Sequence, residues 1–299
     1  MRRREFIRLL GSAAASPFAA RAQQGAIRRV GVLMGFAESD HGAQSGVAVF
    51  REELRKLGWT EGRNIEIDIR WATAESMEAF AKELVALQPD FILTSSTPAT
   101  AAMVQSTHTI PIIFVMVSDP VGSGFVASLP RPGRDVTGFT AIEGSLGGKW
   151  VELLKEIAPQ VARVVLLFNP TMAPYAEYYL HPFKVAAESL GVEAIVAPVH
   201  GSSELESVVA TQARAPNSGL IIMPDAFIIG HRAEITSLAA RYRVPAVYWS
   251  RFFAEVGGLI SYGPNGLDEY SRAASYADRI LRGAKPSELP VQAQSSLNL

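Results

Sequence analysis

The sequence contains no cysteine among its 299 residues. This absence excludes a disulfide framework, a cysteine-ligated metal site and the cysteine that carries the lipid anchor of many exported proteins. The five histidines are scattered, with no two at the spacing of a metal site. They are His41, His108, His181, His200 and His231. No metal and no cofactor are therefore expected.

Motifs of common catalytic sites are also missing. The chain has neither a G-x-S-x-G nucleophile elbow nor a Walker phosphate loop. The run Gly122-Ser123-Gly124 lacks the third glycine of a dinucleotide fingerprint. The sequence predicts a protein that is not an enzyme. The alternative is a periplasmic α/β enzyme with dispersed catalytic residues, such as a carboxylate pair formed by Asp119 and Asp225.

Charge of either sign is scarce and balanced. Lys and Arg number 28 and Asp and Glu number 29, which gives a formal net charge of -1. Nothing in this balance favours nucleic acid or an acidic membrane as a partner. With 48% hydrophobic residues, the chain has enough apolar material for a large core and enough length for two medium domains.

The N-terminus has the pattern of an export signal over residues 1–22. A basic head is followed by an apolar stretch over residues 6–20 and by the small-residue cleavage pattern Ala20-Arg21-Ala22. The run R-R-E-F-I at residues 3–7 has the twin-arginine form. The alternative is an amphipathic N-terminal helix of the mature protein. We expect export to the periplasm, with no lipid anchor and no stable membrane insertion after cleavage.

Strand and helix patterns alternate through the first half of the chain. Strands are predicted at residues 29–34, 64–71, 91–93 and 110–117, and helices at 47–57 and 77–87. Residues 64–71 alternate strictly between apolar and polar, which places this strand near a sheet edge. This alternation predicts an α/β fold with a parallel sheet covered by helices on both faces.

The same pattern then starts again. Strands are predicted at residues 162–168, 192–197, 217–223 and 244–249, with a helix at 183–190 that ends at Gly191 as the first helix ends at Gly58. Two matching cycles favour two Rossmann-like lobes with parallel sheets; the alternative is one long doubly wound sheet. We expect an N-terminal lobe of residues 27–140 plus 252–285, a C-terminal lobe of 141–251 and a tail of 286–299. A strand at residues 257–262 is expected to return the chain to the first lobe, and a closing helix is expected at 270–283.

The stretch at residues 90–103 is the first candidate for a binding site. An apolar strand stops at four hydroxyl side chains, Thr94, Ser95, Ser96 and Thr97, and Pro98 then opens an alanine-rich helix. A helix that begins where a strand ends directs backbone N–H groups into open space, which suits a carboxylate or a phosphate. The alternative is that these hydroxyls only cap the helix.

Polar residues follow other strands as well. In parallel α/β sheets, ligands bind outside the carboxyl ends of the strands. Phe36 follows the first strand, Ser118 and Asp119 the fourth, Asn169 the first strand of the second lobe, and Asp225 its third. Hydroxyls on one lobe and a carboxylate on the other would suit a zwitterion or another polar solute. The alternatives are that Asp225 is a helix N-cap and that Asp119 forms a turn.

Two groups of aromatic residues have two interpretations each. Tyr175, Tyr178 and Tyr179 either form a wall of a cleft or lie on a partly exposed helix surface. Trp249 and the pair Phe252-Phe253 are interpreted as core or hinge packing.

Residues 114–139 resemble a segment of a known family. This segment, F-V-M-V-S-D-P-V-G-S-G-F-V-A-S-L-P-R-P-G-R-D-V-T-G-F, is similar to the signature of a family of ABC transporter substrate-binding proteins with tryptophan- and tyrosine-binding members. Residues 153–159, 168–170 and 280–290 also resemble the family, and the likeness spans essentially the whole mature chain. Two departures are visible: Asp135 stands where asparagine is common, and the chain ends where relatives usually continue, so a truncated C-terminus is expected.

The resemblance implies a type I periplasmic-binding-protein fold with two lobes, three crossovers and a cleft that closes on its ligand. It also implies a role without catalysis, in which a small solute such as an amino acid or related carboxylate is delivered to the membrane permease of an ABC uptake transporter. By this likeness Ser95 and Ser96 would hold a ligand carboxylate with Ser118 or Asp119 beside them, and Asp225 would hold the ammonium group. No aromatic ligand cage is evident in the sequence. A monomer is expected, and a sensor protein is the alternative partner to the permease.

Overall fold

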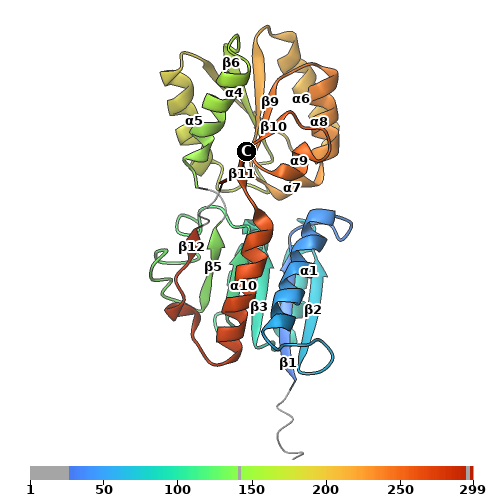
Figure 1. The fold of residues 1–299 in the computed structure, drawn as a ribbon, viewed down its shortest axis with the longest axis vertical. Helices are drawn as coiled ribbons and strands as arrows, with labels where there is room; N and C mark the ends of the chain where they lie inside the picture. The colour runs from blue at the N-terminus through green and yellow to red at the C-terminus, as the bar shows by residue number, and fades with distance from the viewer. Residues whose placement is uncertain (1–26, 141–142, 294–296, 299) are drawn as a thin grey trace, which may run out of the picture.

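The computed structural model of the chain describes residues 27–140, 143–293 and 297–298. Two α/β lobes are stacked along the long axis of the molecule (Figure 1). The predicted export signal at residues 1–22 lies outside the described residues.

The N-terminal lobe is built on a parallel sheet of six strands in the order β12-β5-β4-β3-β1-β2. The strands are β1 (Arg28–Met34), β2 (Ile65–Trp71), β3 (Phe91–Ser95), β4 (Ile112–Val115), β5 (Val136–Thr140) and β12 (Gln292–Ala293). The helices are α1 (His41–Lys56), α2 (Met77–Ala86), α3 (Thr97–Ser106) and α10 (Gly266–Leu281). One core cluster joins the sheet to α1 and α10, and another joins it to α2 and α3, so helices cover both faces. β2 ends the sheet, which confirms the edge position predicted for residues 64–71.

The C-terminal lobe repeats this arrangement with five parallel strands in the order β10-β9-β8-β6-β7. The strands are β6 (Arg163–Phe168), β7 (Glu193–Pro198), β8 (Ser218–Ile222), β9 (Ala246–Tyr248) and β10 (Ile260–Ser261). The helices are α4 (Leu146–Ile157), α5 (Glu177–Ser189), α6 (Ser202–Arg214), α7 (Ala226–Gly230), α8 (Arg232–Arg241) and α9 (Arg251–Ala254). Each lobe places its second strand at the edge and its first strand next to it, so the two-lobe prediction is confirmed and the single-sheet alternative is excluded.

The return of the chain to the first lobe comes later than the sequence indicated. β10 pairs in parallel with β9, and α9 packs against both strands, so residues 252–261 belong to the C-terminal lobe and not to the first. The chain crosses back through β11 (Gly263–Pro264) into α10. The expected strand does form at residues 260–261 as β10, but it pairs with β9 of the C-terminal lobe and not with a strand of the first lobe.

The C-terminal segment, which was expected to be a tail, forms regular elements in its described part. A short 3-10 helix, η1 (Pro286–Glu288), leads into β12, which pairs with β5 and extends the first sheet. β13 (Leu297–Asn298) pairs antiparallel with β11.

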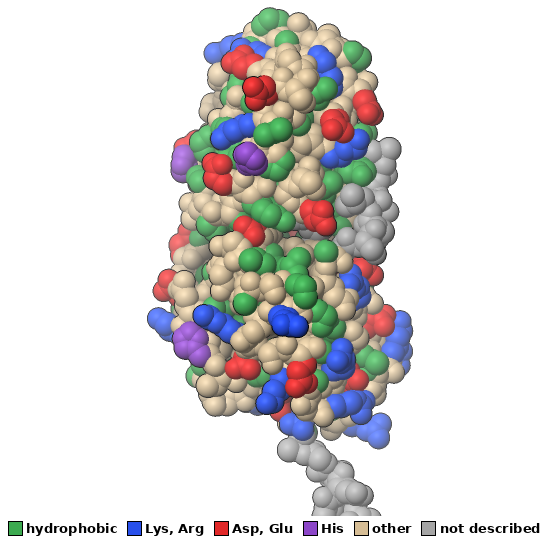
Figure 2. Space-filling view, turned by 90° about the vertical axis from the view of Figure 1, so that its left-hand side faces the viewer, with side chains coloured by type: hydrophobic (Ala, Val, Ile, Leu, Met, Phe, Trp, Pro, Cys, Tyr) green, Lys and Arg blue, Asp and Glu red, His purple; other side chains and the backbone are tan. Residues whose placement is uncertain are grey.

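The described part of the chain contains no helix that is both long enough and apolar enough to span a bilayer. On the face shown in Figure 2, acidic and basic side chains are interspersed over both lobes.

Candidate functional site

The two lobes meet in a narrow cleft with two adjoining halves. Residues of both lobes line each half, and Phe36, Met116, Ile229 and Trp249 line both. The polar half is completed by Ser96, Pro98, Val117, Ser118, Tyr175, Pro224, Asp225 and Ala226. The apolar half is completed by Asp40, Gly42, Ala43, Phe252, Gly266, Leu267 and Tyr270. Each half leaves about 30 Å³ of free space, which suffices for a water molecule and not for an amino acid, so the lobes must separate before a solute can enter.

Ser96 is held in an unusual backbone conformation at the edge of the N-terminal lobe. Its φ is +105° and its ψ is 156°, a region that is essentially reserved for glycine. Its Oγ accepts a hydrogen bond from the Ala99 N–H at 3.3 Å and caps α3. A Cβ on Gly35 would lie 2.1 Å from that Oγ, so the glycine is needed for this approach. Met116 and Asp119, in the loop after β4, also have positive φ angles, and this concentration of strain is typical of a functional edge.

Ser118 connects the two lobes beside the polar half. Its hydroxyl lies 2.8 Å from the hydroxyl of Tyr179 on α5, and its N–H donates to the Thr97 Oγ1 at 3.1 Å. A hydroxyl has one proton to donate and two lone pairs, so Ser118 can accept from Tyr179 while it donates to a ligand.

Asp225 forms the opposite wall of the polar half. Its Oδ1 accepts from the Ile228 N–H at 2.7 Å and its Oδ2 accepts from the Asn169 N–H at 2.9 Å. The side chain therefore caps α7 and lines the cleft at the same time. Burial raises the pKa of Asp225 to about 7, although these N–H groups act in the opposite direction. The carboxyl group is therefore poised to ionise when a positive charge is placed beside it.

A second buried carboxyl group supports the cleft from behind. Glu269 on α10 is fully buried, and its Oε2 accepts from the Met116 N–H at 2.7 Å. Burial raises the pKa of Glu269 to about 8. The bond fixes the backbone of Met116, which lines both halves of the cleft.

An ion pair joins the lobes at the apolar half. Arg232 at the start of α8 contacts Asp40, which caps α1, and the two side chains are 16% and 9% exposed. Arg232 also donates to the Ile229 carbonyl at 2.8 Å. Because the pair bridges the two lobes, separation of the lobes must break it.

The residues predicted from strand ends fall into three places. Four of them, Phe36, Ser96, Ser118 and Asp225, line the polar half of the cleft. Thr97 and Asp119 line an adjacent outer hollow of about 310 Å³. Ser95 and Asn169 are buried and line none of these hollows.

The hydrogen bonds of the residues outside the cleft explain these positions. Asp119 accepts from the Gly122 N–H at 2.8 Å, as the turn interpretation predicted. The Ser95 hydroxyl pairs with Tyr270 at 2.6 Å, and the Asn169 Oδ1 accepts from the Met172 N–H at 3.0 Å. The proposed contacts of all eight residues with a ligand stay predictions.

Aromatic residues were underestimated from the sequence. Phe36, Trp249, Phe252 and Tyr270 line the apolar half together, so an aromatic-lined compartment is present where none was evident. The interpretation of Trp249, Phe252 and Phe253 as core packing is confirmed, since Trp249 and Phe253 are buried in the core of the C-terminal lobe and Phe252 packs against it. Trp249 and Phe252 also line the cleft, which the sequence did not indicate.

The tyrosine cluster is divided between the cleft and the core. Tyr175 lines the polar half and donates from its hydroxyl to the Pro224 carbonyl at 2.8 Å. Tyr179 is fully buried, and Tyr178 lines the outer hollow. The prediction of a cleft wall was therefore correct for Tyr175.

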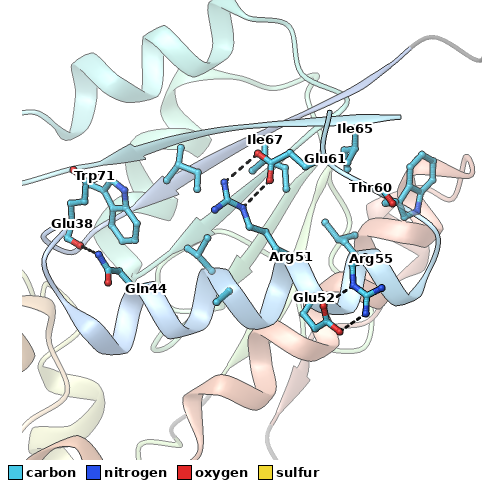
Figure 3. Close-up of a pocket in the computed structure, with 15 residues that line it drawn as sticks. Glu38, Gln44, Arg51, Glu52, Arg55, Thr60, Glu61, Ile65, Ile67 and Trp71 are labelled. Atoms are coloured by element: carbon cyan, nitrogen blue, oxygen red, sulfur yellow. Dashed lines mark hydrogen bonds and ion pairs between the residues drawn. The ribbon is translucent and has the colours of Figure 1, made fainter. Parts of the chain in front are cut away.

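A larger hollow lies elsewhere, on the surface between α1 and the edge strand β2. This groove measures about 950 Å³ (Figure 3). Ile67 and Trp71 form its sheet side, and Arg51 on α1 is paired with Glu61 at 3.1 Å. None of the buried side-chain atoms that lack a hydrogen-bond partner belongs to a described residue of this groove. The described residues also contain no group of three or more His, Cys, Asp or Glu side chains that could hold a metal ion.

Two parallel α/β lobes that enclose a cleft with polar and apolar halves define a two-lobed solute-binding protein. The sequence matches the profile of the family described as ABC transporter substrate binding protein over residues 33–299, and the chain belongs to that family. Its members are substrate-binding proteins and not enzymes. The chain is also 25% identical over 247 residues to a tyrosine-binding protein of Clostridioides difficile, which covers 81% of this chain and 70% of the relative.

Solved structures show the same fold. A conserved domain protein from Vibrio cholerae is 26% identical with a TM-score of 0.83, over 91% of this chain and 90% of that one. An ABC domain from Streptococcus pneumonia in complex with L-Trp is 24% identical with a TM-score of 0.82, over the same shares of the two chains. The ligand-free, open structure of a substrate-binding protein with adhesive properties from Clostridium difficile is 23% identical with a TM-score of 0.66, over 91% of each chain.

Proposed function

We propose that this chain is the periplasmic receptor of an ABC uptake transporter and binds a small polar solute, an amino acid or a related carboxylate, between its lobes. The observation that carries the proposal is the polar half of the cleft. There, Ser96 and Ser118 of one lobe face Asp225 of the other across a space that also adjoins an aromatic-lined compartment.

The two walls suit the two ends of an amino acid. The hydroxyls of Ser96 and Ser118 can donate to a carboxylate, and the N-terminus of α3 adds favourable partial positive charge. Each oxygen of Asp225 has a second lone pair for an ammonium group besides the N–H bond that it already accepts. An ammonium group beside Asp225 would lower its pKa from about 7 and hold it ionised at neutral pH.

Relatives support an amino acid with an apolar side chain. One is named as a tyrosine-binding protein and another is described in complex with L-Trp. In this chain, Phe36, Phe252 and Tyr270 provide a compartment in which an apolar or aromatic side chain would lose its contact with water.

Transport requires that the cleft open and close. The free space of about 30 Å³ in each half admits no amino acid, so the ligand enters when the lobes separate and is enclosed when they return. The crossovers between β5 and α4 and between β10 and α10 are the connections about which the lobes would move. The open form then releases the solute to the permease.

The export pattern at residues 1–22 supports a location in the periplasm. We propose that the signal is removed, that no lipid anchor replaces it because the chain has no cysteine, and that the mature protein works as a monomer with the permease as its partner.

Thermal unfolding of the purified protein in the presence of amino acids and small carboxylates tests this function. A ligand at 100 times its Kd stabilises the folded state by about 2.7 kcal/mol, which raises Tm by several degrees. Ser118→Ala is expected to reduce the shift, whereas Trp71→Ala in the surface groove is expected to leave it unchanged. If no amino acid or carboxylate raises Tm, the proposed function is wrong.

A further inference from the structure

Trp249 presents an unused hydrogen-bond donor at the cleft. Among the described residues that line its two halves, only Trp249 has a buried side-chain nitrogen or oxygen without a hydrogen-bond partner. The residue is 5% exposed, and the atom is the indole Nε1, which carries a proton and can only donate. A buried donor without an acceptor is unfavourable and rare in folded proteins.

The other buried tryptophan of the described chain is satisfied in the usual way. The Trp150 Nε1 donates to the Tyr262 carbonyl at 2.8 Å. The half-buried Trp59 is satisfied as well, since its Nε1 donates to the Asp278 carboxylate at 2.9 Å. Among the described tryptophans, a buried indole N–H without a partner is therefore particular to the position that lines the cleft.

The walls of the apolar half offer no other free polar side chain in the part of the chain that the structure describes. Asp40 is bound to Arg232 and to the Ala43 N–H, and the Tyr270 hydroxyl is bound to Ser95. Phe36 and Phe252 supply apolar surface. No side chain of these walls is therefore free to accept from the Trp249 N–H, and a molecule that occupies the cleft can supply the acceptor.

We propose that the apolar half binds the side chain of the ligand and that Trp249 selects a side chain carrying a hydrogen-bond acceptor, such as a phenol oxygen on an aromatic ring. This inference rests on the function proposed above and adds the chemistry of the ligand side chain. A ring with an acceptor satisfies the indole N–H when the lobes close, whereas a plain ring leaves it buried and unsatisfied.

The neighbouring glycines fit this assignment of the apolar half. A Cβ on Gly42 would lie 3.1 Å from the ring of Phe252, and a Cβ on Gly266 would lie 2.8 Å from the sulfur of Met116. Gly42 allows the two lobes to approach closely, and Gly266 allows Met116 to pack against α10 within the N-terminal lobe, so the compartment is narrow and suited to a flat ring.

Calorimetric titration with L-tyrosine and L-phenylalanine tests the role of Trp249, because the two ligands differ only in the phenol oxygen. The full chain without its signal is expected to bind L-tyrosine roughly tenfold more tightly than L-phenylalanine. Trp249→Phe keeps an aromatic ring and removes the donor, so the tenfold preference should be lost, because L-tyrosine loses its hydrogen bond and L-phenylalanine no longer leaves a buried donor unsatisfied.

Trp150→Phe is the matched control, because it removes an indole N–H whose partner is the Tyr262 carbonyl and not a ligand. This variant should keep the tenfold preference even if it unfolds at a lower temperature. Equal affinities in the wild type, or a preference that survives Trp249→Phe, would overturn the assignment and leave the proposed function intact. If the wild type binds neither amino acid nor any other, the proposed function fails and the assignment fails with it.

Discussion

The surface groove and the interlobe cleft differ in almost every property that matters for binding. The groove between α1 and β2 measures about 950 Å³, whereas each half of the cleft leaves about 30 Å³. In the groove, Arg51 and Glu61 are 43% and 45% exposed and neutralise each other. In the cleft, Arg232 and Asp40 are 16% and 9% exposed and connect two lobes.

The pKa values of carboxyl groups in the groove and in the cleft are shifted in opposite directions. Glu52 at the groove is exposed, and its hydrogen bond with Arg55 lowers its pKa. Asp225 at the cleft is buried, and desolvation raises its pKa to about 7. The groove is therefore a solvated surface in which Arg51 is paired with Glu61 and Arg55 with Glu52, while the proposed ligand site in the cleft has a buried carboxyl group without a cation beside it.

The largest difference between the cleft and the groove is expected when a carboxyl group is removed from each. Asp225→Ala leaves the buried N–H groups of Asn169 and Ile228 without acceptors, and we expect a loss of about 3 kcal/mol in the free energy of unfolding. Glu61→Ala in the groove should cost at most about 1 kcal/mol, because its ion pair is exposed. Denaturant unfolding measures both, and equal losses would contradict the distinction between the two hollows.

The ion pair across the lobes should stabilise the closed form. Arg232→Gln removes the contact with Asp40 and is expected to weaken ligand binding by roughly tenfold, or about 1.4 kcal/mol, because the closed form becomes less favourable. The radius of gyration from X-ray scattering without ligand should increase. Arg51→Gln applies the same substitution in the groove, and an equal effect there would remove the role assigned to the interlobe pair.

The pH dependence of stability should originate in the cleft. The pKa of Glu269 is raised from 4.5 to about 8 by burial, so the folded state holds a proton that the unfolded state has lost between these values. Stability should therefore fall as pH rises from about 5 to about 8, by roughly 3 kcal/mol for this group at about 1.4 kcal/mol per pKa unit. Asp225 contributes in the same direction up to its pKa of about 7.

Glu269→Gln should flatten this dependence in thermal unfolding at a series of pH values. Glu52→Gln in the groove should leave it unchanged, because an exposed carboxyl group with a lowered pKa is ionised in both states throughout this range. Asp225 should leave a smaller slope in this variant, whereas a slope as steep in Glu269→Gln as in the wild type would show that Glu269 is not a source of the pH dependence.

The smallest effect is expected at Ser96, where a glycine should raise stability and weaken ligand binding. Ser96→Gly relieves the strain of a φ of +105° at little cost in capping, and we expect a gain of about 0.5–1 kcal/mol. Ser96→Ala keeps the strain, loses the cap and should lose about 1 kcal/mol. Both variants should bind ligand more weakly, as calorimetry would measure. A glycine variant less stable than the alanine variant would contradict the strain at this position.

Most of the fold could be predicted from the sequence because the same order of strands, helices and helix-ending glycines occurs twice. Gly58 and Gly191 end the corresponding helices, and the apolar strands recur in the same order, so two lobes followed directly. The boundary at residue 252 was wrong because β10 is only two residues long, and its partner strand cannot be identified from so short a pattern.

The candidate site was predicted in part, and the omissions have a physical cause. Met116 and Trp249 are the first residues after β4 and β9. The strands predicted from the sequence included these two apolar residues. The residues considered as ligand groups therefore began one or two positions further along the chain. Asp40 and Arg232 are 192 residues apart, and nothing in the sequence pairs them before the lobes are placed together.

The central claim is that the ligand binds in the cleft and not in the groove, and the tryptophans report on both. Trp59 and Trp71 line the groove, Trp249 lines the cleft and Trp150 is buried in the C-terminal lobe. With the protein labelled by 5-fluorotryptophan and its four signals assigned by Trp→Phe variants, ¹⁹F NMR can follow a titration with L-tyrosine. The signal of Trp249 should shift to saturation while those of Trp59 and Trp71 stay in place. A saturable shift of Trp59 or Trp71 with an unchanged Trp249 signal would contradict the account.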